Sequence, residues 1–178
     1  QFFQDRFIQR AAAHLSNTFE SDRIVAIVDS LSSAIELEMP SHIDRWGSEG
    51  GVSSMNQWYN ELDEIKQFSQ KRNTIVQNQF INELNLEGTV RVTVAVEPPG
   101  SGMIYINNVP VINPDGEGDY FKNKPIFLRA QPLPGYQFMG WAGVSDSTQI
   151  EYTCSTDNLF TAVFQSSDEI ILPGVIKE

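Results

Sequence analysis

The sequence of 178 residues is poor in the residues that mark several common kinds of site. It has one cysteine, Cys154, so neither an internal disulfide nor a cysteine zinc cluster can form within it. Its two histidines, His14 and His42, lack the spacing of a zinc-protease motif. No apolar run approaches the roughly 18 residues that a membrane-spanning helix needs. These absences exclude a disulfide framework and disfavour both a transmembrane helix and a histidine–cysteine metal centre.

Positive charge is also scarce. The chain has 12 Lys and Arg against 23 Asp and Glu, a formal net charge of −11. The acidic excess is spread over both halves, which is typical of a solvated surface rather than of an acidic tail. Because such a chain repels phosphate backbones, we expect no nucleic-acid partner.

What the chain does contain is enough apolar volume for a core, with 40% apolar residues and 11 Phe. Residues 1–86 carry it at helical spacing, in stripes that step by three and four. Ser21 is expected to cap one helix and Ser54, with Gln57, another. Pro40 must lie at a kink or in the first turn of a short helix. The last stripe is too long for a typical helix, so a bend or break is expected near Arg72–Asn73.

From Gly88 the period changes from helical to two, the period of a strand. Turn sequences such as 98–102, 113–118 and 132–135 separate the alternating runs. Six strands are expected, around Val90–Val96, Ile104–Ile106, Ile126–Ala130, Tyr136–Trp141, Ile150–Cys154 and Phe160–Phe164.

The fold class predicted is α+β, an N-terminal helical subdomain over 1–86 followed by a small antiparallel β domain over 88–165, as a sheet or a sandwich. The change is expected within about four residues of Glu87. Residues 166–178 are expected to be a linker or tail, with a strand-like stretch at Glu169–Ile176.

The candidate nucleophile and bases are isolated from one another in the sequence. Cys154 lies in a strand-like run without a local activating signature, which favours a small buried apolar residue. His14 and His42 could act as a base or a ligand, but a helix-surface or partly buried position is favoured.

Two loops have some features of a ligand-binding site. The loop Gly47–Ser54 opens a helix as a phosphate loop does, but it lacks the lysine and the preceding strand. Asp115, Glu117 and Asp119 alternate with glycines as in a calcium loop, yet the position that an EF-hand needs as an acid is Ile126. A plain loop and a solvated hairpin turn are the favoured interpretations.

Two further groups have both a functional and a structural interpretation. Tyr136 and Trp141 could form a sugar-stacking platform, although core packing is favoured for aromatic residues in strands. Lys66, Lys71 and Arg72 could contact phosphate, although a solvated helix face without a glycine cradle is favoured.

The helical half resembles a known family through one specific segment, Glu38–Trp46 (EMPSHIDRW). It follows Arg6-Phe7 and Leu15–Phe19 and precedes Trp58, Phe68, Arg72 and Phe80. This order resembles the C-terminal helical end of the bacterial spore-coat CotH kinase family over residues 2–86. Within the segment, Ile43 and Trp46 share a helix face, so Trp46 is expected to be packed.

The β half resembles the divergent InlB-type bacterial repeat. The similarity lies in Leu128–Trp141, with its Gly-Tyr-x-Phe-x-Gly-Trp pattern, and in Phe160–Phe164. Such repeats are β-rich stalk or spacer modules of secreted and surface proteins.

The CotH resemblance implies an ATP- and magnesium-dependent protein kinase for the complete parent, and an extracellular or cell-surface location. The acidic metal-binding motifs of that family precede its helical end, and no D-F-G-like or D-x-D motif occurs in residues 1–86. No catalytic, cofactor-binding or metal residue is therefore assigned, and no cofactor is expected in this chain.

The first functional hypothesis is a non-catalytic C-terminal piece of a CotH-like kinase, with the upstream kinase-lobe segment as partner on an exposed apolar helical face. The second is a surface binding or adhesion module that recognises glycan or protein through the β domain. The third is an enzyme with a site shared between the two halves.

Overall fold

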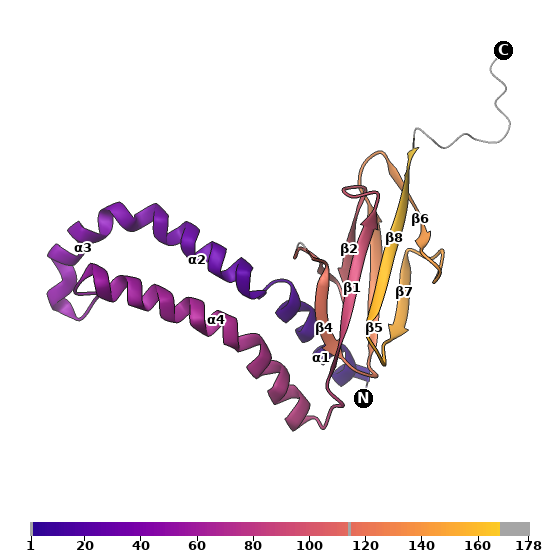
Figure 1. Ribbon diagram of the computed structural model, residues 1–178, viewed down its shortest axis with the longest axis horizontal. Helices are drawn as coiled ribbons and strands as arrows, with labels where there is room; N and C mark the ends of the chain where they lie inside the picture. Colours follow the sequence, from indigo (N-terminus) through magenta and orange to yellow (C-terminus); the bar gives the residue numbers. More distant parts are fainter. Residues whose placement is uncertain (1, 114, 168–178) are drawn as a thin grey trace, which may run out of the picture. The chain divides into compact units, whose positions relative to one another are not determined.

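The computed structural model describes residues 2–113 and 115–167 and confirms the α+β fold class. The helices come first and the strands follow (Figure 1). The helical elements are α1 (Phe2–Ser16), α2 (Ser21–Ile35), η1 (Glu36–Glu38), α3 (Met39–Trp46), η2 (Gly47–Glu49) and α4 (Met55–Glu83). The strands are β1 (Thr89–Glu97), β2 (Gly102–Ile106), β3 (Val109–Pro110), β4 (Glu117–Phe121), β5 (Pro125–Pro132), β6 (Tyr136–Trp141), β7 (Gln149–Thr153) and β8 (Asn158–Ser166).

The change from helix to strand lies where the sequence predicts it. Helix α4 ends at Glu83 and β1 begins at Thr89, on either side of Glu87. The strand-like stretch Glu169–Ile176, in the predicted tail, lies outside the described residues.

The contacts group the chain into two compact units. One is Phe19–Gln79, called the helical unit below. The other joins Gln1–Thr18 to Phe80–Glu178 and is called the β unit. Helix α1 thus belongs with the strands, although its apolar spacing alone gives no sign of this. The predicted division at 1–86 and 88–165 follows secondary structure, whereas the contacts follow packing.

The helical unit is an antiparallel hairpin of α2 and the first part of α4, joined by α3 (Figure 1). The N-cap of α2 is Glu20 rather than Ser21, because the Glu20 carboxylate accepts hydrogen bonds from the backbone N–H groups of Asp22 and Arg23. Pro40 lies in the first turn of α3, where its missing N–H costs nothing. The Ser54 hydroxyl caps α4 by accepting from the Gln57 N–H at 3.1 Å, as predicted.

The sequence predicts a bend or a break near Arg72–Asn73, and no break occurs there, since α4 runs unbroken over 29 residues. Its sequence contains neither proline nor glycine, the usual causes of a sharp kink. The β-branched run Thr74-Ile75-Val76 lowers helix propensity by only a few tenths of a kcal/mol per residue, roughly, which is too little to end the helix.

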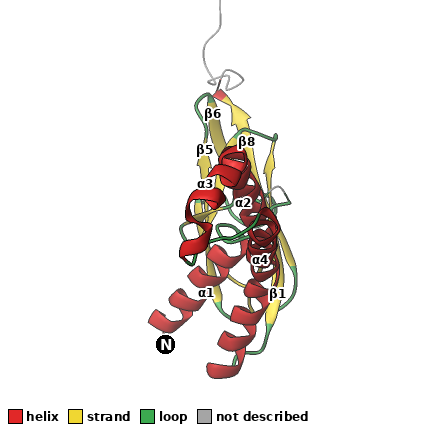
Figure 2. Ribbon diagram, turned by 90° about the vertical axis from the view of Figure 1, so that its left-hand side faces the viewer, coloured by secondary structure: helices red, strands yellow, loops and turns green. Residues whose placement is uncertain are grey.

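The β unit contains two four-stranded sheets, ordered β4-β1-β8-β6 and β3-β2-β5-β7. Figure 2 shows the strands in yellow and the helices in red. All strand pairs are antiparallel except β1 and β8, which run parallel. The sequence had suggested six strands; β3 and β4 are additional, and β4 lies at an edge of its sheet. Alternate residues of the strands form one shared core, including Val92, Ile104, Phe121, Leu128 and Phe160.

Helix α1 completes this core and covers the edge strand β4. Ile8, Ala12 and Ala13 are fully buried in the same apolar cluster as the strands. Two polar side chains at the end of α1 and directly after it also bind β4 and the loop before it. Asp119 N–H donates to the Ser16 hydroxyl, and Ile112 N–H donates to the Asn17 side chain. An uncovered edge strand exposes unpaired backbone groups. Helix α1 covers β4 and so takes the place that a further strand would have beside it.

Trp46 is 45% exposed, so the prediction that it is packed is wrong. The ring contacts the Arg45 guanidinium, 5.1 Å from its centroid, rather than a buried partner. In the same segment Met39 is buried, at 8% exposure.

We therefore expect Trp46→Ala to lower the free energy of unfolding by less than about 1 kcal/mol, the scale of an exposed cation–π contact. Urea unfolding followed by circular dichroism measures this. The matched control is Trp58→Ala in the same unit, whose ring is 7% exposed and whose removal should cost several times more. A loss at Trp46 equal to that at Trp58 would show that Trp46 is packed after all.

Candidate functional site

The candidate nucleophile and bases do not form a catalytic group. Cys154 is 1% exposed, as the buried interpretation predicted, and burial raises the pKa of its thiol to about 11. The thiolate is therefore scarce at neutral pH. His14 shares a hydrogen bond of 3.0 Å with the Thr18 hydroxyl, and His42 is exposed on α3. Among residues 2–113 and 115–167, no three His, Cys, Asp or Glu side chains gather as a metal site.

The acidic hairpin residues surround an arginine instead of an open space. The Arg91 guanidinium lies 3.0 Å from Glu117 and 3.2 Å from Asp119, and Arg91 N–H donates to Asp157. These carboxylates raise the pKa of Arg91, with the hydrogen bond to Asp119 the largest cause. Asp115 is exposed. The positive charge beside Glu117 and Asp119 is therefore the Arg91 guanidinium, at the place where the sequence resembles a calcium loop.

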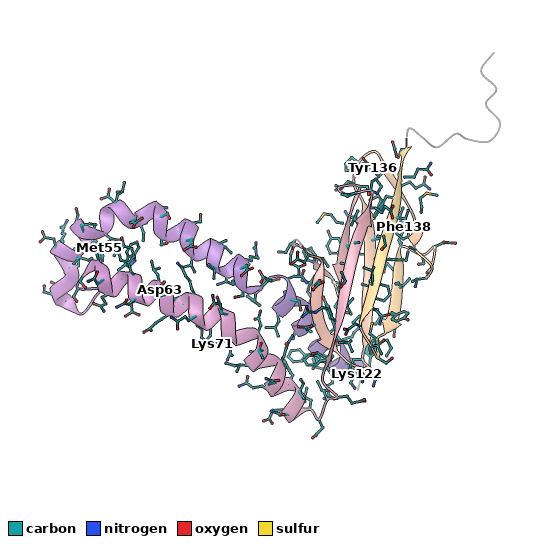
Figure 3. The ribbon with its side chains drawn as sticks, viewed as in Figure 1. Met55, Asp63, Lys71, Lys122, Tyr136 and Phe138 are labelled. Carbon is teal, nitrogen blue, oxygen red and sulfur yellow. The ribbon has the colours of Figure 1, made fainter. Side chains whose placement is uncertain are left out.

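Tyr136 and Trp141 do not form an exposed aromatic platform. Trp141 is 2% exposed and packs edge-on against Phe138, with ring centroids 5.9 Å apart. Tyr136 is half-buried at the start of the same strand, and Figure 3 shows Tyr136 and Phe138 together at the end of the β unit opposite Lys122. A ring buried on all sides cannot stack on a sugar, so the favoured core interpretation of Trp141 is confirmed.

Two of the basic side chains of α4, Lys66 and Arg72, have partners within the chain. Lys66 forms a salt bridge of 2.6 Å with Asp29, and this hydrogen bond is the largest cause that raises the pKa of Lys66. The Arg72 guanidinium lies over the Phe68 ring at 5.7 Å. Lys71 is exposed on the helix surface (Figure 3). No glycine cradle faces them, because the Gly47–Ser54 loop forms η2 and the cap of α4.

The helical unit has an exposed apolar side. The sequence predicts such a surface but does not show which residues form it. Helix α2 has no buried residue, and large apolar side chains on both helices face solvent. Between 40% and 66% of each of the following is exposed: Ile27, Leu31, Ile65, Phe68 and Ile75. A hollow of about 280 Å³ lies beside them, lined by Arg23, Ala26, Ile27, Ser30 and Leu31. Their three- and four-residue spacing was visible in the sequence, but whether they faced a core or solvent was not.

Fold and site together describe an α+β protein with an amphipathic helical hairpin and a two-sheet β unit. None of the described helices is long and apolar enough to cross a membrane. The family model described as CotH kinase protein matches residues 1–76. The match covers α1 to α3 and most of α4, so the helical part is similar to CotH kinase proteins. No curated protein and no solved structure matches the chain. The InlB-type repeat resemblance of the strands stays a prediction.

Proposed function

We propose that this chain is a non-catalytic part of a CotH-like protein kinase, with helices that complete the kinase domain and strands that follow them as a spacer. The observation that supports this most is the family match over residues 1–76. The pairing of two basic side chains that could otherwise bind phosphate also supports the proposal. Lys66 pairs with Asp29, and Arg91 pairs with Glu117 and Asp119, so both are committed to intramolecular carboxylates.

ATP and magnesium belong, in this proposal, to the parent kinase and not to this chain. A magnesium ion between phosphates needs one or two free carboxylates beside a phosphate-binding loop. In the described residues Asp29, Glu117 and Asp119 face basic partners, and the glycine-containing loop before α4 lacks a lysine. The residues present therefore do not fit the nucleotide, and no catalytic step is derived from them.

The location proposed for the parent is extracellular or at the cell surface, as in spore-coat proteins, and it rests on the resemblance alone. The adhesion alternative would need a surface other than Trp141, because that ring is buried. The shared-site enzyme would need acids or histidines gathered in one place, and the described residues hold no such group of three.

The chain is expected to bind ATP–magnesium no more tightly than about 1 mM and to hydrolyse none of it. Titration calorimetry with ATP and magnesium, and an assay for released phosphate, measure this directly. The matched variants are Lys66→Met, which removes a paired cation, and Lys71→Met, which removes an exposed one. Neither should change the heats. A micromolar dissociation constant that Lys66→Met or a helical Asp→Asn change abolishes would place a nucleotide site here and contradict the proposal.

A further inference from the structure

The helical unit has one polar and one apolar side, and two side-chain contacts define which is which. Lys66 reaches Asp29, and the Tyr59 hydroxyl donates to Glu36 at 2.7 Å. The first contact joins α2 to α4, and the second joins η1, directly after α2, to α4. Asp29 and Glu36 are seven residues apart, as are Tyr59 and Lys66, so each pair lies on one side of its segment and these four residues mark the polar side of the hairpin. Since a helix advances 100° per residue, Ile27 lies about half a turn from Asp29, and Phe68 lies half a turn from Tyr59.

The same geometry gathers the other exposed apolar residues opposite the polar side. Leu31 and Ala34 follow Ile27 on α2, and Ile65 and Ile75 flank Phe68 on α4. We call this side the apolar face. It consists of Ile27, Leu31, Ala34, Ile65, Phe68 and Ile75. Its large side chains are 40% to 66% exposed. Exposed apolar patches larger than roughly a few hundred Å² mark interaction surfaces.

The helical unit needs such a surface covered, because its own interior is thin. In the fully described stretch Phe19–Gln79 the buried residues are Met39, Trp58 and Ser69. Two antiparallel helices can bury only the stripe between them, and the remaining apolar stripe of each helix requires another layer.

Charge is distributed unevenly along the apolar face. The Asp29–Lys66 contact shows which residues of the antiparallel helices lie opposite each other. Six residues before Asp29 on α2 is Arg23, and six residues after Lys66 on α4 is Arg72, so these two arginines also lie at the same level. Glu61 and Glu64 lie at the other end of the face, level with Ala34 and Leu31. The face therefore has a basic end and an acidic end, and Phe68 lies midway between Glu64 and Arg72 on α4.

We propose that a second copy of this chain covers the apolar face, related by a two-fold axis near Phe68, to form an antiparallel four-helix bundle. This arrangement places Arg72 of each copy beside Glu64 of the other, so the basic end meets the acidic end twice. The same axis places Phe68 of each copy beside Phe68 of the other, at the centre of the apolar face. Two such faces together approach the roughly 1,200 Å² at the lower end of specific interfaces.

An upstream kinase segment, the partner expected from the sequence, is the competing occupant of this face. It would explain the exposed apolar residues, but it gives no reason for the opposite charges at the two ends. Self-pairing explains both, because a two-fold axis needs a surface that is complementary to itself.

Sedimentation equilibrium of the complete 178-residue chain tests the proposal. We expect a species of twice 20.0 kDa at micromolar concentration. Phe68→Glu should raise the dissociation constant at least roughly 30-fold, as for an interface hot spot. The matched control is Gln70→Glu, which adds the same charge on the polar side of α4 and should leave the dimer unchanged. Circular dichroism confirms that each variant keeps its helices.

A charge exchange tests the orientation. Arg72→Glu and Glu64→Arg should each weaken the dimer, and the double variant should restore it. A monomer at all micromolar concentrations would overturn the proposal and favour the upstream segment. So would a dimer indifferent to Phe68→Glu, or a double variant weaker than both single variants. The test is independent of the nucleotide titration, so either proposal can fail alone.

Discussion

Replacing Gln9 by Leu should destabilise the β unit by about 3–5 kcal/mol, although the position lies in a helix remote from the strands in sequence. Gln9 is 1% exposed. Its Nε2 donates to the Phe121 carbonyl at 2.9 Å and to the Lys124 carbonyl at 3.0 Å, and its Oε1 accepts from the Phe121 N–H at 2.9 Å. The carboxamide thus makes to β4 the pair of bonds that a neighbouring strand would make.

The cost follows from the backbone groups that the substitution would leave behind. Phe121 is fully buried, so its N–H and carbonyl would lose their partner without gaining water. A buried polar group without a partner costs roughly 1–3 kcal/mol, and leucine is branched where glutamine is straight. The Asn107 side chain donates to the backbone carbonyl of Gln9 and accepts from Phe127 N–H. The Gln9→Leu change keeps this bond, so the loss comes from the carboxamide alone.

Urea unfolding of the complete chain, followed by tryptophan fluorescence, measures the Gln9→Leu effect. Gln4→Leu is the matched control, since Gln4 is exposed on the same helix and should change stability by less than about 0.5 kcal/mol. Equal effects at the two positions would mean that α1 is not part of the β unit.

Trp141→Ala is expected to lower the stability of the β unit by about 3–5 kcal/mol. The indole is 2% exposed in the core shared with Phe160 and Phe164, and it packs against Phe138. Its removal would leave a large cavity that rigid neighbouring strands cannot close. Since small domains are stable by only 5–15 kcal/mol in general, this loss is a large share of the total.

The readout is the shift of the thermal or urea transition in the complete chain. Met139→Ala is the control, because Met139 is 48% exposed on the same strand and should cost under about 1 kcal/mol. A folded, fully stable Trp141→Ala variant with altered ligand binding would instead support an aromatic binding platform.

The particular residues show which parts of the site the sequence could reveal. The spacing of Ile27 and Leu31, and of Ile65, Phe68 and Ile75, identified apolar helix stripes. Spacing reports that residues share a face, but it does not report what covers that face. Trp46 is an example. Helical spacing places it on one face with Ile43, but nothing covers that face fully, and Trp46 is 45% exposed. The salt bridges of Arg91 and Lys66 join residues far apart in sequence, so no local pattern signals them.

The sequence by itself determined most of the secondary structure, with β3 and β4 the exceptions, and the place where it changes. The period passes from helical to alternating near Glu87, and local propensity and capping residues then suffice to form α4 and β1. Only the tertiary structure decided the membership of α1. Its apolar stripe is compatible with any apolar surface, and the choice of the β unit depends on Gln9, Ser16 and Asn17 meeting the backbone of β4 and the loop before it. Those bonds join positions about a hundred residues apart, and such pairings depend on three-dimensional geometry that periodicity does not encode.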